Sequence, residues 1–134
     1  MSVSDLDAKQ ARRLLDILNY SRKAVHFAAG VELAAFRKDE MRKLSLERCF
    51  EVIGEAARHV TPESAAKVGG LPLDKMRGMR NLISHDYLRV EPADVLRTAQ
   101  VNLPVLLQKL EPIEKDLCVA ANLQLPPSQA TPFI

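Results

Sequence analysis

The apolar residues between Asp39 and Val60 recur at intervals of three and four, which is the period of an amphipathic helix. No stretch of the chain alternates apolar and polar residues as a half-buried strand does, and no internal repeat is present. The 134 residues include four Phe, two Tyr and no Trp, so the core must consist of Leu, Val, Ile, Ala and Met. We therefore predict an all-α fold, an up-down bundle of four to five helices.

The predicted helix starts share a capping residue or a first-turn proline: the capping box of Ser4 and Asp7, Asp39, Thr61-Pro62, and Pro92. Pro104 lacks a backbone donor and is expected to kink the last long helix. From Gln124 onward the sequence has no periodicity. We expect one helical domain over residues 1–118 and a flexible C-terminal tail over residues 119–134.

Charge and cysteine content exclude several classes of protein. The net charge of +2 does not by itself indicate a nucleic-acid binder. Cys49 and Cys118 are far apart, so the sequence offers neither a disulfide framework nor a Cys/His metal site, and we expect no metal and no cofactor. The N-terminus lacks the pattern of a signal peptide, and no apolar run is long enough to span a bilayer. We expect a cytoplasmic protein without a membrane partner.

The predicted helix that starts at Leu71-Pro72 and ends near Leu88 has an unusual polar side. Its residues Arg80, Asn81, Ser84 and His85 fall within a fan of about 140° on a helical wheel. Leu73, Met76, Met79 and Ile83 occupy a different arc that can face a core. From spacing alone, a lone histidine on a helix is more often a structural residue than a catalytic one.

The segment Arg80-Asn81-x-x-x-His85-x-Tyr87 resembles the signature of the HEPN superfamily, and in particular of its HepT-like branch. Three further blocks resemble that branch in the same order: Glu51–Ala57 (E-V-I-G-E-A-A), Val90-Glu91 and Leu103–Leu106 (L-P-V-L). The resemblance covers about residues 5–115. It departs at Leu73, where the family usually has a bulky aromatic residue.

The resemblance implies a HEPN-like helical fold, a homodimer and an enzyme. In the family, two subunits pair so that both motifs line one cleft, which supplies two arginines and two histidines. The resemblance implies the toxin of a type VII-like toxin–antitoxin system, a metal-independent endoribonuclease that cleaves cellular RNA, with transfer RNA as one candidate and no DNA partner. Arg80 and His85 are then the catalytic pair, supported by Asn81 and Ser84.

These residue types fit RNA cleavage. RNA is cut without a metal when the 2′-hydroxyl loses its proton, attacks the adjacent phosphate and expels a protonated 5′-oxygen. Histidine transfers protons near neutral pH, whereas arginine holds a phosphate and stabilises charge on its oxygens. Asn81 is able to hydrogen-bond the imidazole or the phosphate.

Two further residues have predicted roles. In HepT-like proteins, the tyrosine at the position of Tyr87 accepts AMP from a partner minimal nucleotidyltransferase, the antitoxin. The bulk and negative charge of AMP would block the phosphate site. Glu55 adjoins Gly54, a small residue that permits a close helix crossing. Glu55 is then either an exposed glutamate or a carboxylate that orients an arginine of the motif helix.

Two other functions remain open from the sequence. One is a non-catalytic HEPN helical module that serves as a dimerisation or antitoxin-binding protein, which is consistent with the near-neutral charge and the few aromatic residues available for base stacking. The other is a nucleotide-binding accessory domain. Gly69-Gly70 lacks the Lys-Ser/Thr of a phosphate-binding loop, so the sequence gives this second alternative little support.

Overall fold

The computed structural model describes residues 2–86 and 91–123, with the backbone alone at 81–86. Within these ranges the chain is helical and has no strand, as predicted. The helices are α1 (Ala8–Ala28), α2 (Leu33–Lys38), α3 (Glu40–Arg58), α4 (Pro62–Lys67), α5 (Leu73–Asp86), α6 (Pro92–Arg97), α7 (Leu103–Leu110) and α8 (Glu114–Ala120). A 3-10 segment, Val3–Asp5, precedes α1, a π segment, Thr98–Asn102, joins α6 to α7, and a 3-10 segment, Glu111–Ile113, joins α7 to α8.

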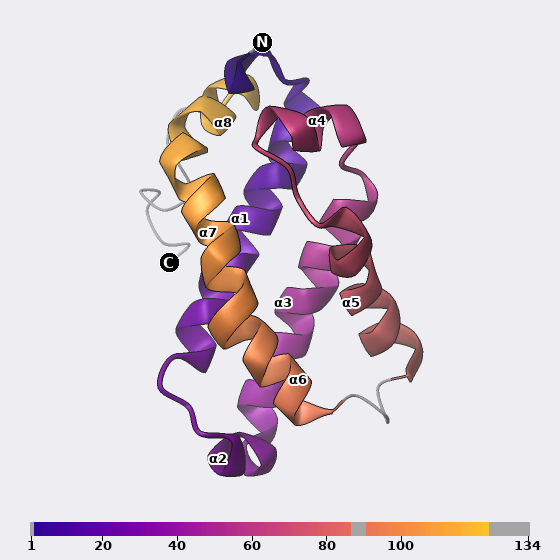
Figure 1. The fold of residues 1–134 in the computed structure, drawn as a ribbon, viewed down its shortest axis with the longest axis vertical. Coiled ribbons are helices and arrows are strands. Elements are labelled where there is room, and N and C mark those ends of the chain that lie inside the picture. The colour runs from indigo at the N-terminus through magenta and orange to yellow at the C-terminus, as the bar shows by residue number, and fades with distance from the viewer. Residues whose placement is uncertain (1, 87–90, 124–134) are drawn as a thin grey trace.

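Four long rods run up and down the molecule, namely α1, α3, α5 and the continuous path from α6 into α7 (Figure 1). The short helices α2 and α4 lie at opposite ends and connect consecutive rods. Counted this way the bundle has about six helices rather than the predicted four to five, because both connections contain helical turns of their own. No helix in the described ranges is long and apolar enough to cross a membrane.

The helix starts follow the capping residues in the sequence, with one exception. Asp39 accepts a hydrogen bond from the backbone nitrogen of Arg42 (3.0 Å), and Thr61 caps α4 in the same way. The predicted capping box of Ser4 and Asp7 is wrong. The chain is extended at Leu6, which is buried, and Asp7 alone caps α1 at Ala8. Burial of one leucine thus delays the first helix by several residues.

The last rod accommodates Pro104 with a π turn at Thr98–Asn102. A proline cannot donate to the carbonyl four residues earlier, so the wider turn shifts the hydrogen-bond register just before it. Gln100, within this turn, donates from Nε2 to the carbonyls of Ala28 and Val31, each at 2.8 Å. The turn therefore ties the last rod to the end of α1.

The core is aliphatic, as the composition predicts. Its largest fully buried side chains come from α1, α2, α3, α7 and α8, and include Leu14, Leu18, Phe36, Ile53, Leu110 and Leu117. Cys49 and Cys118 are buried as free thiols. Helix α8 continues to Ala120, and Ala121 is fully buried, so the packed domain extends beyond residue 118. Residues 124–134 of the predicted tail lie outside the described residues.

Candidate active site

Helices α3 and α5 come closest at Gly54, the small residue that the sequence marks as a crossing point. A Cβ atom on Gly54 would lie 2.3 Å from the Cβ of Arg80 and 3.0 Å from both the Arg80 nitrogen and the Met76 carbonyl oxygen. Only a residue without a side chain fits this contact. The predicted close crossing is confirmed, and Arg80 lies directly on it.

Next to this crossing, Glu55 of α3 forms an ion pair with Arg80 of α5. The distance from Arg80 Nε to Glu55 Oε2 is 2.8 Å. The same carboxylate accepts from Arg58 Nη1 at Oε2 and lies beside His59 Nε2 at Oε1, each at 3.2 Å. The hydrogen bond with His59, followed by the charges of Arg58 and Arg80, lowers the pKa of Glu55. Glu55 is therefore ionised at neutral pH and holds Arg80 by charge and geometry together.

His59 is itself held in place by helix α1. Gln10 donates from Nε2 to the His59 carbonyl (2.5 Å) and accepts from the backbone nitrogen of Thr61 at Oε1 (2.9 Å). One amide side chain thus satisfies a donor and an acceptor at the end of α3, where backbone groups lack helical partners. The sequence did not predict a role for His59. Its spacing of four residues from Glu55 is the one signal that points to their contact.

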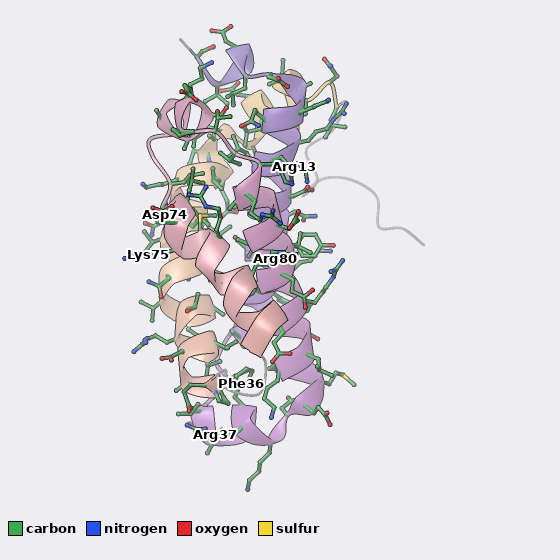
Figure 2. The ribbon with its side chains drawn as sticks, turned by 90° about the vertical axis from the view of Figure 1, so that its right-hand side faces the viewer. Arg13, Phe36, Arg37, Asp74, Lys75 and Arg80 are labelled. Atoms are coloured by element: carbon green, nitrogen blue, oxygen red, sulfur yellow. The ribbon has the colours of Figure 1, made fainter. Side chains whose placement is uncertain are left out.

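A groove of about 260 Å³ opens beside the ion pair. Its lining comes from α1, α3 and α5 and consists of Arg13, Asp16, Arg48, Glu51, Val52, Glu55, Ala56 and Arg80. Figure 2 shows Arg13 and Arg80 on the same side of the bundle. The side chain of Arg80 is 29% exposed, so an external ligand is able to reach it while Glu55 fixes its position.

The predicted site residues lie on α3 and α5, apart from Tyr87. Arg80 is described in full and pairs with Glu55. Asn81, Ser84 and His85 lie on the backbone of α5, and His85 is five residues beyond Arg80, about 7.5 Å along the helix axis. Tyr87 lies outside the described residues. The structure thus places the predicted pair on one helix, places the predicted carboxylate of Glu55 on Arg80, and adds Arg58 and His59 as partners of Glu55.

Comparisons with a family model and with individual proteins point to the same kind of protein. The family described as "Ribonuclease HepT-like" matches residues 17–113. Two proteins of Methanocaldococcus jannaschii, named Putative RNase MJ1216 and Putative RNase MJ0125, are each 32% identical over 104 residues. These matches cover 78% of this chain and 86% and 90% of the relatives. Putative RNase TTE0752 of Caldanaerobacter subterraneus is 27% identical over 84 residues, covering 63% of this chain and 75% of that protein. No solved structure gives a significant match.

Proposed function

Because the chain belongs to the HepT-like ribonuclease family, we propose that it is an endoribonuclease with Arg80 and His85 as its catalytic pair. The observation that supports this most is the fixed guanidinium. Arg80 faces a groove open to solvent, its Nε lies 2.8 Å from the Glu55 carboxylate, and His85 follows on the same helix. This arrangement suits a phosphate ligand, since the anion would bind beside a preset positive charge.

The proposed chemistry divides between the two residues. Glu55 binds Arg80 through Nε, and the two terminal nitrogens of the guanidinium form the fork that binds a phosphate. Negative charge grows on the phosphate oxygens as the 2′-hydroxyl attacks, and a fixed guanidinium stabilises it. His85 transfers the proton, either from the 2′-hydroxyl or to the leaving 5′-oxygen. In this mechanism no metal is needed, and Asn81 and Ser84 support the pair.

Glu55 is the orienting carboxylate in this proposal. An arginine has several rotatable bonds, and ordering it at the moment of substrate binding would reduce the affinity for substrate. The pairing with Glu55 restricts Arg80 before the substrate arrives, and Arg58 and His59 in turn restrict Glu55. Loss of Glu55 should therefore lower the rate of cleavage without removing the phosphate-binding group.

The proposed enzyme is a homodimer, because one copy of the motif supplies a single imidazole for two proton transfers. An apolar groove on α1 and α3 is the surface that fits a second copy. It is lined by Tyr20, Lys23, Phe27, Met41, Leu44, Ser45, Arg48 and Cys49. Met41 is 80% exposed and Leu44 57%. Arg48 also lines the Arg80 groove, so a second copy seated here would lie beside the proposed active site.

The surface for the second copy has a direct test. Replacing Met41 and Leu44 with aspartate puts two desolvated charges into the proposed contact and should yield monomers with little cleavage activity. Light scattering coupled to size-exclusion chromatography gives the mass of the wild-type protein and of the variant. A variant that keeps the dimeric mass would place the contact elsewhere.

We further propose that the protein is the toxin of a type VII-like toxin–antitoxin pair and acts on cytoplasmic RNA, with transfer RNA as one candidate. Its antitoxin would be a minimal nucleotidyltransferase that attaches AMP to Tyr87. Each AMP adds a negative phosphodiester seven residues from Arg80, close enough in sequence to compete for its guanidinium. Intact mass after co-expression with such a partner tests this. A Tyr87→Phe protein that still gains the mass of AMP would exclude Tyr87.

The nuclease assignment is tested with purified protein. Arg80→Ala and His85→Ala should each abolish cleavage of a mixed cellular RNA preparation, while far-ultraviolet circular dichroism shows the helical content of the wild type. Undiminished cleavage by both variants would refute the assignment. An absence of cleavage by the wild-type dimer would instead favour the non-catalytic helical module.

A further inference from the structure

A second groove continues from the Arg80 groove along α1. It measures about 510 Å³ and is lined by Lys9, Gln10, Arg12, Arg13, Asp16 and His59. The two grooves share Arg13 and Asp16, so they are neighbours on one face of the bundle. A ligand bound at Arg80 and longer than one nucleotide is therefore able to extend past Arg13 toward Lys9.

The charge of the two grooves matches that of a phosphate chain. Together they are lined by five cationic side chains and three carboxylates, an excess of two. That excess equals the net charge of the whole chain, so the remaining residues sum to zero. A protein that looks nearly neutral in composition thus concentrates its positive charge on the face that holds Arg80.

Within the described residues, Arg13 and Lys9 are the cations of this face whose side chains form no hydrogen bond or ion pair. Arg12 donates to the Ala121 carbonyl (3.3 Å), and Arg48 lies 3.6 Å from Glu51. Among the residues that the structure describes, neither Arg13 nor Lys9 forms an ion pair with a carboxylate within 4 Å. The charge of Arg13 acts on Asp16 from a longer distance, where it opposes the effect of burial on the pKa of that carboxyl. Cations that are not neutralised internally are the ones able to release counterions from a phosphate.

Two other grooves of the described surface suit different ligands. The one between α5 and α7 is lined mainly by Pro72, Met76, Met79, Leu103 and Leu106, and its one charged residue is Lys75. The groove proposed above for the second copy is also mainly apolar. Neither offers successive phosphates a row of cations, whereas the path from Arg80 to Lys9 does.

We propose that this path binds the single-stranded RNA next to the cleavage site. Arg80 holds one phosphate, and Arg13 and then Lys9 contact the phosphates that follow it along the path. The inference rests on the proposed ribonuclease function. It makes Arg13 and Lys9 binding residues that determine how far the substrate must extend beside the cut. They take no part in proton transfer.

The test measures binding of a fluorescent single-stranded RNA whose 2′-hydroxyls are all methylated, so that it cannot be cleaved by 2′-hydroxyl attack. Fluorescence anisotropy gives Kd across a series of salt concentrations for the wild type and for the Lys9→Gln/Arg13→Gln variant. The matched control is Lys38→Gln/Arg97→Gln. This pair has the same charge change, and both residues are exposed and outside the grooves. Arg97 forms an ion pair with Asp94 (2.9 Å), whereas Arg13 forms none with Asp16, so the control reports the effect of net charge alone.

We expect Kd to rise about tenfold in the Lys9/Arg13 variant. The slope of log Kd against log salt should fall by about 1.4, or about 0.7 for each lost phosphate contact. The control should keep the wild-type slope. If the Lys9/Arg13 variant and the control have the same Kd and the same salt slope while the wild type cleaves and binds RNA, the path is wrong and the ribonuclease assignment stands. If the wild type neither binds nor cleaves RNA, both proposals fail.

Discussion

Replacing Gly54 with alanine tests whether the α3–α5 crossing fixes the position of Arg80. The new methyl group would lie 2.3 Å from the Arg80 Cβ, whereas carbon atoms in contact lie about 3.5–4.0 Å apart. Two of its three neighbours are backbone atoms, so no side-chain rotation relieves the clash and the helices must move apart. Overpacking of this kind costs about 1–3 kcal/mol, and we take the upper end, about 3 kcal/mol, because backbone must shift.

Alanine also favours helix over glycine by about 1 kcal/mol, so the net loss in the free energy of unfolding is about 2 kcal/mol. For a domain of this size that lowers Tm by about 8 °C. The shift also carries Arg80 away from Glu55, so RNA cleavage should fall by more than the loss of folded protein explains. Thermal melting followed by circular dichroism, with cleavage measured well below Tm, gives both quantities.

Gly78→Ala is the matched control. Gly78 is exposed on α5, and a Cβ there would have nothing within 4 Å. The same substitution should therefore raise stability by up to about 1 kcal/mol and leave cleavage unchanged. The two glycines should give shifts of opposite sign. An equal rise in Tm for both variants would refute the close crossing and the account of how Arg80 is positioned.

Three further predictions follow from the site and the core. Because the pKa of Glu55 is lowered in the folded protein, its contribution to stability is present above the ordinary carboxyl pKa of about 4.3 and is lost as pH falls through the lowered value. Wild type and Glu55→Gln should thus differ in denaturant midpoint at pH 7 and converge as the pH falls through the lowered pKa, and a constant difference would contradict the pairing. Gln10→Leu leaves the His59 carbonyl and the Thr61 nitrogen without their partner, so the free energy of unfolding should fall by about 1 kcal/mol. Urea unfolding measures this, and an unchanged midpoint would show that water replaces the amide. Burial raises the pKa of the Cys49 and Cys118 thiols, so both should react with a thiol reagent only in step with unfolding, and rapid labelling of the native protein would contradict their burial.

Much of the fold was predictable because its signals are local. Asp39, Thr61-Pro62 and Pro92 mark helix starts through their own backbone neighbours, and the structure begins helices there. The first helix was misplaced because burial of Leu6 depends on the rest of the core, which a local pattern does not contain. The sequence predicts a kink at Pro104, but the π turn also involves the hydrogen bonds from Gln100 to the carbonyls of Ala28, at the end of α1, and Val31, just beyond it.

The candidate site also has features that the sequence predicts and features that it does not. Arg80 and His85 are close in sequence, so a helical wheel places them on one element. Gly54 indicated a crossing, but the wheel could not say which residue would lie against it, and that residue is Arg80. The clamp from Gln10 to the end of α3 joins residues about fifty positions apart, and no sequence pattern indicates it. Contacts of this range follow from the packing of whole helices.

The chemistry at the cleavage site tests the central claim most directly, since Arg80 and His85 are proposed to promote attack by the 2′-hydroxyl on the adjacent phosphate. Mass spectrometry of the products from one defined RNA, and from the same RNA with every 2′-hydroxyl methylated, shows whether that hydroxyl is the nucleophile. We predict fragments that end in a 2′,3′-cyclic phosphate from the first RNA and no cleavage of the second. Cleavage of the methylated RNA, or persistence of the cyclic-phosphate products with Arg80→Ala, would contradict the account.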